Sequence, residues 1–169
     1  MSRAVAILLC AGGSTRMGFD KLLTPNAGKT AIERSMDALV RGGAEQIVFA
    51  VSPATNAFVE ALACPVEKRI VSGGNTRAQS VKNALNVIDC ADIVAIHDAA
   101  RCMISPATIR ESIESAERYG SGVVSGRVTD TIVQLSSGRV ETLDRSKLIR
   151  MQTPQTFLFS RIKAAYDTG

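Results

Sequence analysis

The segment AVAILLCAGGSTRMGFDK, residues 4–21, decides how this chain begins to fold. Its apolar beginning predicts a buried strand over residues 4–9. That strand runs directly into a glycine-rich loop that carries Arg16 and Lys21. Small residues let backbone N–H groups approach anionic oxygens closely, and the two cations can neutralise those oxygens. The segment therefore predicts a first strand that ends at a site for phosphate groups.

Beyond this segment, strand-like runs alternate with helical patterns. Further strands are expected at residues 46–51, 68–71, 92–96 and 122–128. Helices are expected after the capping boxes Thr30–Glu33 and Thr76–Gln79, after a turn at Ser52-Pro53, after Ser105-Pro106, and over residues 158–166. Strands that alternate with helices of this length predict an α/β protein, with a mostly parallel sheet and helices on both faces.

A different pattern follows residue 129. Residues 131–135 and 139–143 flank a Ser137-Gly138 turn, which predicts a β-hairpin. A hairpin appended to an α/β sheet often projects, so residues 129–150 form a candidate arm for a partner subunit. The whole chain, residues 1–169, is expected to form one domain, which is large enough to bury a substantial core.

Composition narrows the class of ligand and the compartment. The formal net charge of +4 is modest and spread along the chain, and only two Tyr, five Phe and no Trp are present, so nucleic acid is not an expected partner. No apolar run approaches a membrane span, and no signal peptide is expected. Four cysteines without a CxxC pair, together with a single histidine, make zinc improbable and favour a cytoplasmic protein with reduced thiols.

Three polar segments follow predicted strands, at residues 11–21, 72–77 and 97–101. Ligands of open α/β sheets bind beyond the carboxyl ends of the strands, so these segments are expected to converge on one edge of the sheet. Neither a P-loop nor a GxGxxG pattern is present, because Leu23 replaces the leading glycine of one candidate P-loop and Phe19 the lysine of the other. The phosphate site is therefore of another type.

Asp98 ends an apolar strand, where a carboxylate is costly unless it is paired or binds a metal. Magnesium bridging phosphate oxygens would use one such carboxylate, and an ion pair with Arg101 explains the residue equally well. By strand alternation His97 points to the opposite face, and we expect it to be a hydrogen-bonded structural residue. Residues 72–75 together with Arg77 can contact a sugar or base, helix capping by Asn75 or Thr76 is the alternative, and both roles can hold together.

Several separated motifs together match one family. They are Ala11-Gly12-x-x-x-Arg16-Met17-Gly18 with Lys21, Gly73-Gly74-x-x-Arg77-x-x-Ser80-Val81, His97-Asp98-Ala99-Ala100-Arg101, Asp130-Thr131, Asp144-Arg145 and Thr153-Pro154-Gln155. On these motifs the chain resembles the 2-C-methyl-D-erythritol 4-phosphate cytidylyltransferases of the non-mevalonate isoprenoid pathway. Ribitol-5-phosphate cytidylyltransferases share the motifs and are the alternative. One departure is Cys102, where the family usually has proline.

The resemblance implies a Rossmann-like nucleotidyltransferase fold, that of the nucleotide-diphospho-sugar transferases, and a homodimer formed through the projecting β-arm. It implies transfer of CMP from CTP to the polyol phosphate, with Mg²⁺ at Asp98 and pyrophosphate as the leaving group. Arg16, Lys21 and Arg145 would be catalytic, and Arg145 would act on the partner subunit's site. Thr131, Arg145 and Thr153 would bind the acceptor. The implied nucleotide-binding residues are Cys10, Ala11, Gly12, Gly13, Gly74, Asn75, Arg77, Ser80, Asp98 and Ala99.

This chemistry suits the residues of the chain, because the acceptor phosphate is already an anion and needs no general base. Positioning and electrostatic stabilisation then suffice. Family members are expected to continue for roughly another third of this length, with a second metal-binding aspartate and a lysine. The chain is therefore expected to be a piece of a longer protein or a shortened homologue. A nucleotide-binding or dimerisation module without turnover is the non-enzyme alternative.

Overall fold

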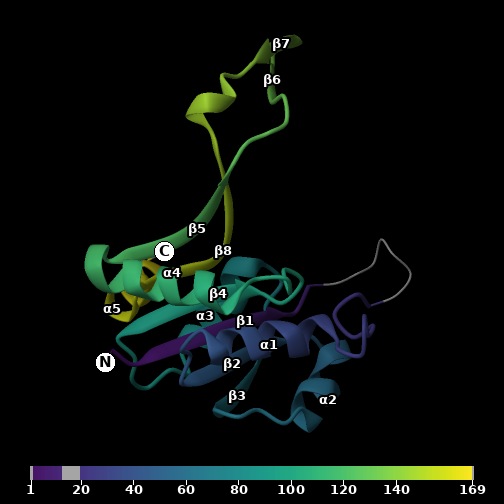
Figure 1. The fold of residues 1–169 in the computed structure, drawn as a ribbon, viewed down its shortest axis with the longest axis vertical. Coiled ribbons are helices and arrows are strands. Elements are labelled where there is room, and N and C mark those ends of the chain that lie inside the picture. Colours follow the sequence, from purple (N-terminus) through teal and green to yellow (C-terminus); the bar gives the residue numbers. More distant parts are fainter. Residues whose placement is uncertain (1, 13–19, 169) are drawn as a thin grey trace.

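The computed structural model describes residues 2–12 and 20–168, and within them a six-stranded sheet organises the chain (Figure 1). The strand order is β3-β2-β1-β4-β8-β5. The first four of these are parallel to one another, whereas β8 is antiparallel to both of its neighbours. The strands are β1 (Ala4–Cys10), β2 (Gln46–Val51), β3 (Glu67–Ser72), β4 (Ile93–Asp98), β5 (Ser121–Arg127) and β8 (Ile149–Leu158).

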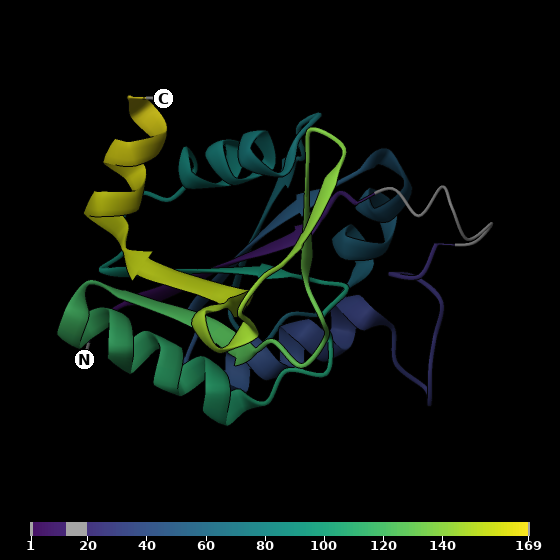
Figure 2. The ribbon, with the colours of Figure 1, turned by 90° about the horizontal axis from the view of Figure 1, so that it is seen from above.

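Helices cover both faces of the sheet, as the sequence predicts (Figure 2). One face packs against α1 (Ala31–Arg41), α2 (Pro53–Ala61) and α4 (Pro106–Tyr119), and the other against α3 (Arg77–Leu85) and α5 (Phe159–Asp167). Strand β1 shows why both faces must be covered. Ala6 and Leu8 enter the first of these cores, and Val5 and Ile7 enter the second, because successive side chains of a strand point to opposite sides. The sheet is therefore a buried middle layer.

The helix starts confirm most of the predicted caps. Thr30 and Glu33 form a reciprocal capping box at α1, and Ser105 caps α4 ahead of Pro106. Ser52 caps α2, so the predicted turn there is the start of the helix itself. At α3, the hydroxyl of Thr76 accepts from the Gln79 amide, but the Gln79 side chain donates to Asn83 instead of returning to the cap. The second predicted capping box is therefore only half formed.

Strand β8 is an element that the sequence analysis did not predict. It pairs with β4 on one side and β5 on the other, and so separates two strands that precede it in the chain. Pro154 obscures this strand in the sequence, since proline cannot donate to a sheet ladder. It is tolerated because the β5–β8 register shifts between the pairs Val123–Gln155 and Ser125–Met151, and Pro154 lies within that irregular stretch.

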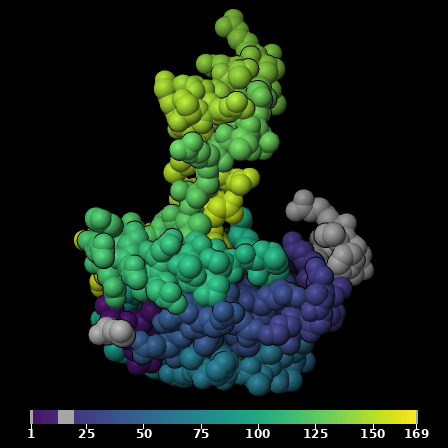
Figure 3. All heavy atoms as spheres, in the orientation of Figure 1, coloured from purple at the N-terminus to yellow at the C-terminus, as the bar shows by residue number. Residues whose placement is uncertain are grey.

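The predicted hairpin is present and projects from the body of the molecule (Figures 1 and 3). Its strands are β6 (Val133–Ser136) and β7 (Arg139–Thr142). Ser137 and Gly138 both have positive φ, of 49° and 78°, which is the turn geometry that matches the twist of a tight hairpin. A short 3₁₀ helix, η1 (Arg145–Lys147), leads from the hairpin toward β8. Within the described chain, no helix is long and apolar enough to cross a membrane.

Candidate functional site

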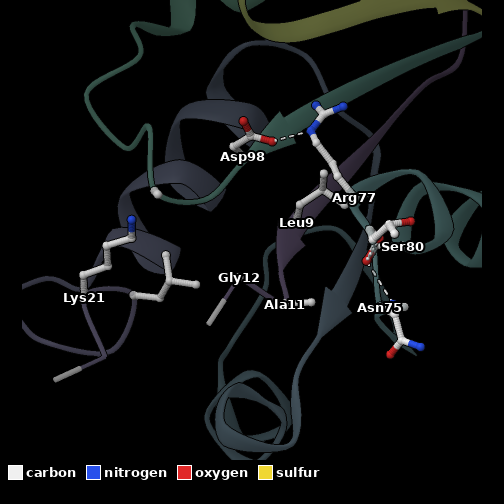
Figure 4. Close-up of a pocket in the computed structure, with 12 residues that line it drawn as sticks. Leu9, Ala11, Gly12, Lys21, Asn75, Arg77, Ser80 and Asp98 are labelled. Carbon is white, nitrogen blue, oxygen red and sulfur yellow. Dashed lines mark hydrogen bonds and ion pairs between the residues drawn. The ribbon is translucent and has the colours of Figure 1, made fainter. Parts of the chain in front are cut away.

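A pocket of about 430 Å³ lies at the carboxyl ends of β1 and β4, beside the first turn of α3 (Figure 4). This is the edge at which open α/β sheets bind ligands, and the volume suits a nucleotide-sized molecule. The three segments that the sequence predicts to converge all contribute. The lining residues are Leu9, Ala11, Gly12, Lys21, Leu22, Gly74, Asn75, Thr76, Arg77, Ser80, Asp98 and Ala100.

One wall of the pocket depends on the close approach of two loops. A Cβ atom on Gly73 would lie 2.3 Å from the Cβ of Ala11, and one on Gly74 would lie 2.1 Å from the Cγ of Gln79. At either position an added Cβ would force the neighbouring atoms to shift. By contrast, a Cβ on Gly12 would meet nothing within 4 Å among the described atoms, because this residue borders open pocket space.

Ser80 ties the loop before α3 to the helix itself. Its hydroxyl accepts from the Gly74 amide at 2.9 Å and donates to the Thr76 carbonyl at 3.0 Å. The side chain is buried, so the hydroxyl is committed to holding the wall in shape. Asn75 is exposed between these anchored residues and is one of the lining residues of the pocket.

Asp98 carries the negative charge of the pocket and is held between two guanidinium groups. Its Oδ1 lies 3.1 Å from Nε of Arg77, and its Oδ2 lies 3.2 Å from Nε of Arg101. The ion pair with Arg101 that the sequence suggested is therefore present, and Arg77 adds a second one across the pocket. The side chain of Asp98 keeps 29% of its surface exposed, so the carboxylate remains accessible from the pocket.

Positive charge comes from more than one direction. Lys21 approaches from the side of the pocket opposite Asn75 and Ser80 in the view of Figure 4. Arg77 reaches in from the first turn of α3. Two residues predicted from the glycine-rich loop, Gly13 and Arg16, lie outside the described residues. The described lining of the pocket thus contains two cations, Lys21 and Arg77, and a single carboxylate.

Two predicted nucleotide-binding residues lie behind the pocket wall. Cys10 and Ala99 are both fully buried and are not lining residues. Burial, aided by the charge of Asp20, raises the pKa of the Cys10 thiol to about 12. The Ala99 amide donates to the Leu9 carbonyl at 3.1 Å, which links the ends of β1 and β4. Direct contact of either residue with a nucleotide stays a prediction.

Thr153 forms hydrogen bonds just behind the charged end of the pocket. Its Oγ1 lies 2.9 Å from Nδ1 of His97 and accepts from the Asp98 amide at 3.3 Å. His97 is fully buried, and burial lowers its pKa to about 4 against a smaller opposing effect of the Asp98 charge. The expectation of a hydrogen-bonded structural histidine is therefore confirmed. Because Thr153 is only 5% exposed, its predicted role in binding the acceptor stays a prediction.

The remaining predicted residues, Thr131 and Arg145, belong to the arm and are exposed. Arg145 donates from Nη1 to the Thr129 carbonyl at 2.8 Å, which braces the base of the arm. The described lining of the pocket extends only from Leu9 to Ala100, so the arm does not reach the pocket of its own chain. The predicted roles of Thr131 in acceptor binding and of Arg145 in catalysis and acceptor binding stay predictions.

Four residues that line the pocket had no predicted site role: Leu9, Leu22, Thr76 and Ala100. Three of them carry a recognisable signal. Leu9 is the penultimate residue of β1, Thr76 caps α3, and Ala100 lies between the two charged residues Asp98 and Arg101. Leu22 carries no comparable signal, because its burial comes from its place in the hydrophobic core.

Solved structures share this arrangement over nearly the whole chain. A 4-diphosphocytidyl-2C-methyl-D-erythritol synthase from Anaerococcus prevotii superposes with a TM-score of 0.85 at 22% identity, covering 99% of this chain and 76% of that one. A 2-C-methyl-D-erythritol 4-phosphate cytidylyltransferase from Francisella tularensis gives 0.79 at 28% identity, covering 99% and 77%. Fold and pocket therefore define an α/β protein of the nucleotidyltransferase-like class.

Within that class, the family described as 2-C-methyl-D-erythritol 4-phosphate cytidylyltransferase (IspD) matches residues 4–169, and the chain belongs to it. A bifunctional IspD/IspF enzyme from Nitrobacter winogradskyi is 39% identical over 97% of this chain, which spans 43% of that relative. A 2-C-methyl-D-erythritol 4-phosphate cytidylyltransferase from Thermotoga neapolitana is 33% identical over 96% of this chain and 76% of its own length. The chain thus spans less than half of the bifunctional relative.

Proposed function

We propose that this chain transfers a cytidylyl group from CTP to 2-C-methyl-D-erythritol 4-phosphate and releases pyrophosphate. The observation that carries the proposal is the pocket at the ends of β1 and β4. It combines a wall of close-packed glycines with Lys21, Arg77 and Asp98. Membership of the family supports the identity of both substrates.

Some residues of the pocket would let the nucleotide approach closely, and others would stabilise its charge. Backbone N–H groups near Gly12 and Gly74 can approach the nucleotide closely, since no side chain intervenes there. Lys21 and Arg77 face the polyphosphate and stabilise the negative charge that develops as the acceptor phosphate attacks the α-phosphorus. The acceptor is already anionic, so the reaction needs positioning and charge stabilisation and no proton abstraction.

Mg²⁺ is the metal that we propose, and Asp98 would hold it. The fit is reasonable because Mg²⁺ in phosphoryl-transfer sites uses one or two carboxylates together with substrate phosphates. Across the described chain, no cluster of three or more His, Cys, Asp or Glu side chains could hold a metal ion without a substrate. Asp98 would hold the ion through its carboxylate, and the ion would supply positive charge that offsets the charge of the phosphate groups.

The test is pyrophosphate release. We expect release with CTP and 2-C-methyl-D-erythritol 4-phosphate, and little with ATP, GTP or UTP. Ribitol 5-phosphate supplied in a parallel reaction decides the alternative acceptor. Lys21→Ala should lower the rate, whereas Lys163→Ala, which removes a cation of α5 that pairs with Asp167, should not. If the chain binds CTP in a calorimeter but releases no pyrophosphate with either acceptor, only the hypothesis of a nucleotide-binding or dimerisation module without turnover remains.

We further propose that two chains associate through their arms. Apolar side chains are exposed along the arm and its base: Val133, Leu135, Val140, Ile149 and Met151. Large apolar side chains exposed on a projecting hairpin favour burial against a partner. An arm that crosses to the partner would also bring Thr131 and Arg145 near the partner's pocket. The cytoplasm is the compartment we propose, and the free state of the four cysteines supports it.

A further inference from the structure

The proposed reaction leaves the one histidine of the sequence without a task. His97 is fully buried in β4, directly before Asp98. Its Nδ1 lies 2.9 Å from Oγ1 of Thr153, in the neighbouring strand β8. Its Nε2 is the one buried side-chain N or O atom in the described chain that forms no hydrogen bond of normal geometry. A buried polar ring next to a pocket residue calls for a physical reason.

Thr153 joins this histidine to the pocket. The Asp98 amide donates to the same Oγ1 at 3.3 Å, so one hydroxyl contacts both the imidazole and the backbone of the pocket carboxylate. The preceding residue, Gln152, accepts from the guanidinium of Arg101. Strand β8 therefore holds the turn from Asp98 to Arg101 at both of its ends.

The direction of these hydrogen bonds follows from the donors and acceptors available. A backbone amide can only donate, so Asp98 fills one lone pair of the Thr153 hydroxyl. If Nδ1 accepts the hydroxyl proton, Thr153 is satisfied and only the Nε2–H of the ring lacks a good partner. If Nδ1 carries the proton instead, both the hydroxyl proton and the Nε2 lone pair lack partners. The first arrangement leaves fewer buried groups unpaired and is the cheaper one.

We infer that His97 is a positioning residue, with its proton on Nε2, that acts through the Thr153 hydroxyl to hold the backbone of Asp98 at the charged end of the pocket. The kinetic consequence rests on the proposed function. Loss of the bond from Thr153 to Nδ1 should lower kcat roughly tenfold, the effect of about one hydrogen bond. The KM for CTP should stay nearly unchanged, because the wall formed by Gly74 and Ser80 is untouched.

The first experiment needs no turnover. One histidine gives one imidazole spin system, so a ¹⁵N-labelled sample at pH 7 reports its tautomer directly. We expect the proton on Nε2 in the unaltered chain, and a changed Nδ1 shift in Thr153→Val, which removes the hydroxyl. A proton found on Nδ1, or an Nδ1 shift unaffected by Thr153→Val, overturns the inference. This result stands even if the chain releases no pyrophosphate and the proposed function fails.

The second experiment is a rescue. His97→Asn places an amide oxygen near the position of Nδ1 and should keep kcat within about threefold of the unaltered chain. His97→Leu should lower kcat about tenfold, because it removes roughly one hydrogen bond. The double variant His97→Leu with Thr153→Val should be no slower than Thr153→Val alone, since removal of the hydroxyl already breaks the bond to His97. Should His97→Leu fail to fold, Thr153→Ser against Thr153→Val gives the same comparison. Equal activity of the Asn and Leu variants, or additive losses, overturns the role.

Discussion

Nε of Arg77 lies 3.1 Å from Oδ1 of Asp98, so the first turn of α3 is joined to the carboxyl end of β4 across the mouth of the pocket. Two consecutive elements of the chain therefore supply the two charges of one ion pair. Both side chains are partly exposed, at 45% and 29%, and this exposure decides what the pair can contribute. Its contribution to folding is small, because surface ion pairs give about 1 kcal/mol or less.

Arg77→Ala should consequently weaken nucleotide binding without unfolding the protein. We expect the affinity for CTP to fall about tenfold, the effect of losing one charge-assisted hydrogen bond. Calorimetric titration measures this change. Arg69→Ala is the matched control, since Arg69 pairs with Glu67 and Asp89 away from the pocket. Equal affinities for CTP in the two variants would contradict the placement of the nucleotide.

Two glycine variants distinguish a glycine that is needed for packing from one that borders the space for the ligand. Gly73→Ala should destabilise the fold by about 1–3 kcal/mol, because its Cβ would lie 2.3 Å from the Cβ of Ala11. Gly12→Ala should change the free energy of unfolding by about 0.5 kcal/mol or less, since a Cβ there meets no described atom within 4 Å. Its cost should appear instead as weaker CTP binding. Denaturant titration measures the change in the free energy of unfolding of both variants. An unchanged stability of Gly73→Ala would show that the two loops can move apart.

Stability should depend on pH through His97. Its pKa is 6.5 in the unfolded chain and about 4 in the folded one, so the unfolded state binds the proton more readily. Stability is therefore complete above pH 6.5 and falls as the pH drops toward 4, by up to about 3 kcal/mol. Denaturant titrations across this range should show the decline.

His97→Asn serves as the control for that pH dependence, because asparagine does not titrate. The decline between pH 6.5 and 4 should be absent in this variant. Glu33 and Asp144 also have lowered pKa values, but their contributions are lost only below about pH 4.5. An identical decline in both proteins would assign the effect to other groups.

The arm predicts the oligomeric state. Leu135→Asp should convert a dimer into monomers, because a charge in the middle of a buried apolar contact is costly. Sedimentation velocity measures the change. Tyr119→Asp alters a similarly exposed residue, 76% accessible in each case, at the end of α4 and outside the arm, and should leave the mass unchanged. A monomeric parent chain would remove the basis for a role of Arg145 in the partner's pocket.

Local signals in the sequence predicted most elements of the fold. The strand at 46–51 and the helix start at Thr30 agree with the structure because each depends on neighbouring residues: a continuous apolar run and a capping box. Strand β8 was missed because it has no such signal. Arg150, Gln152 and Pro154 interrupt its apolar pattern, and its place in the sheet is determined by pairing with β4 and β5.

The candidate site also contains residues with a local sequence signal and contacts without one. Gly74, Arg77 and Asp98 were found because glycines and charges at strand ends are visible in sequence. The bonds from Thr153 to His97 and Asp98 were not found, since they cross between strands more than fifty residues apart. Contacts of that range follow from the strand order, and the strand order depends on the one strand that the sequence concealed.

The position of β8 also determines the order in which the sheet can be completed during synthesis. β4 and β5 emerge from the ribosome before β8 but do not pair with each other. The β4 edge therefore remains open until the chain has been made through Leu158, and only then can β8 enter between the two strands. Such long-range pairing is slow, and an open hydrophobic edge invites association with other chains. A newly synthesised chain is therefore most prone to associate with other chains while its arm is being translated.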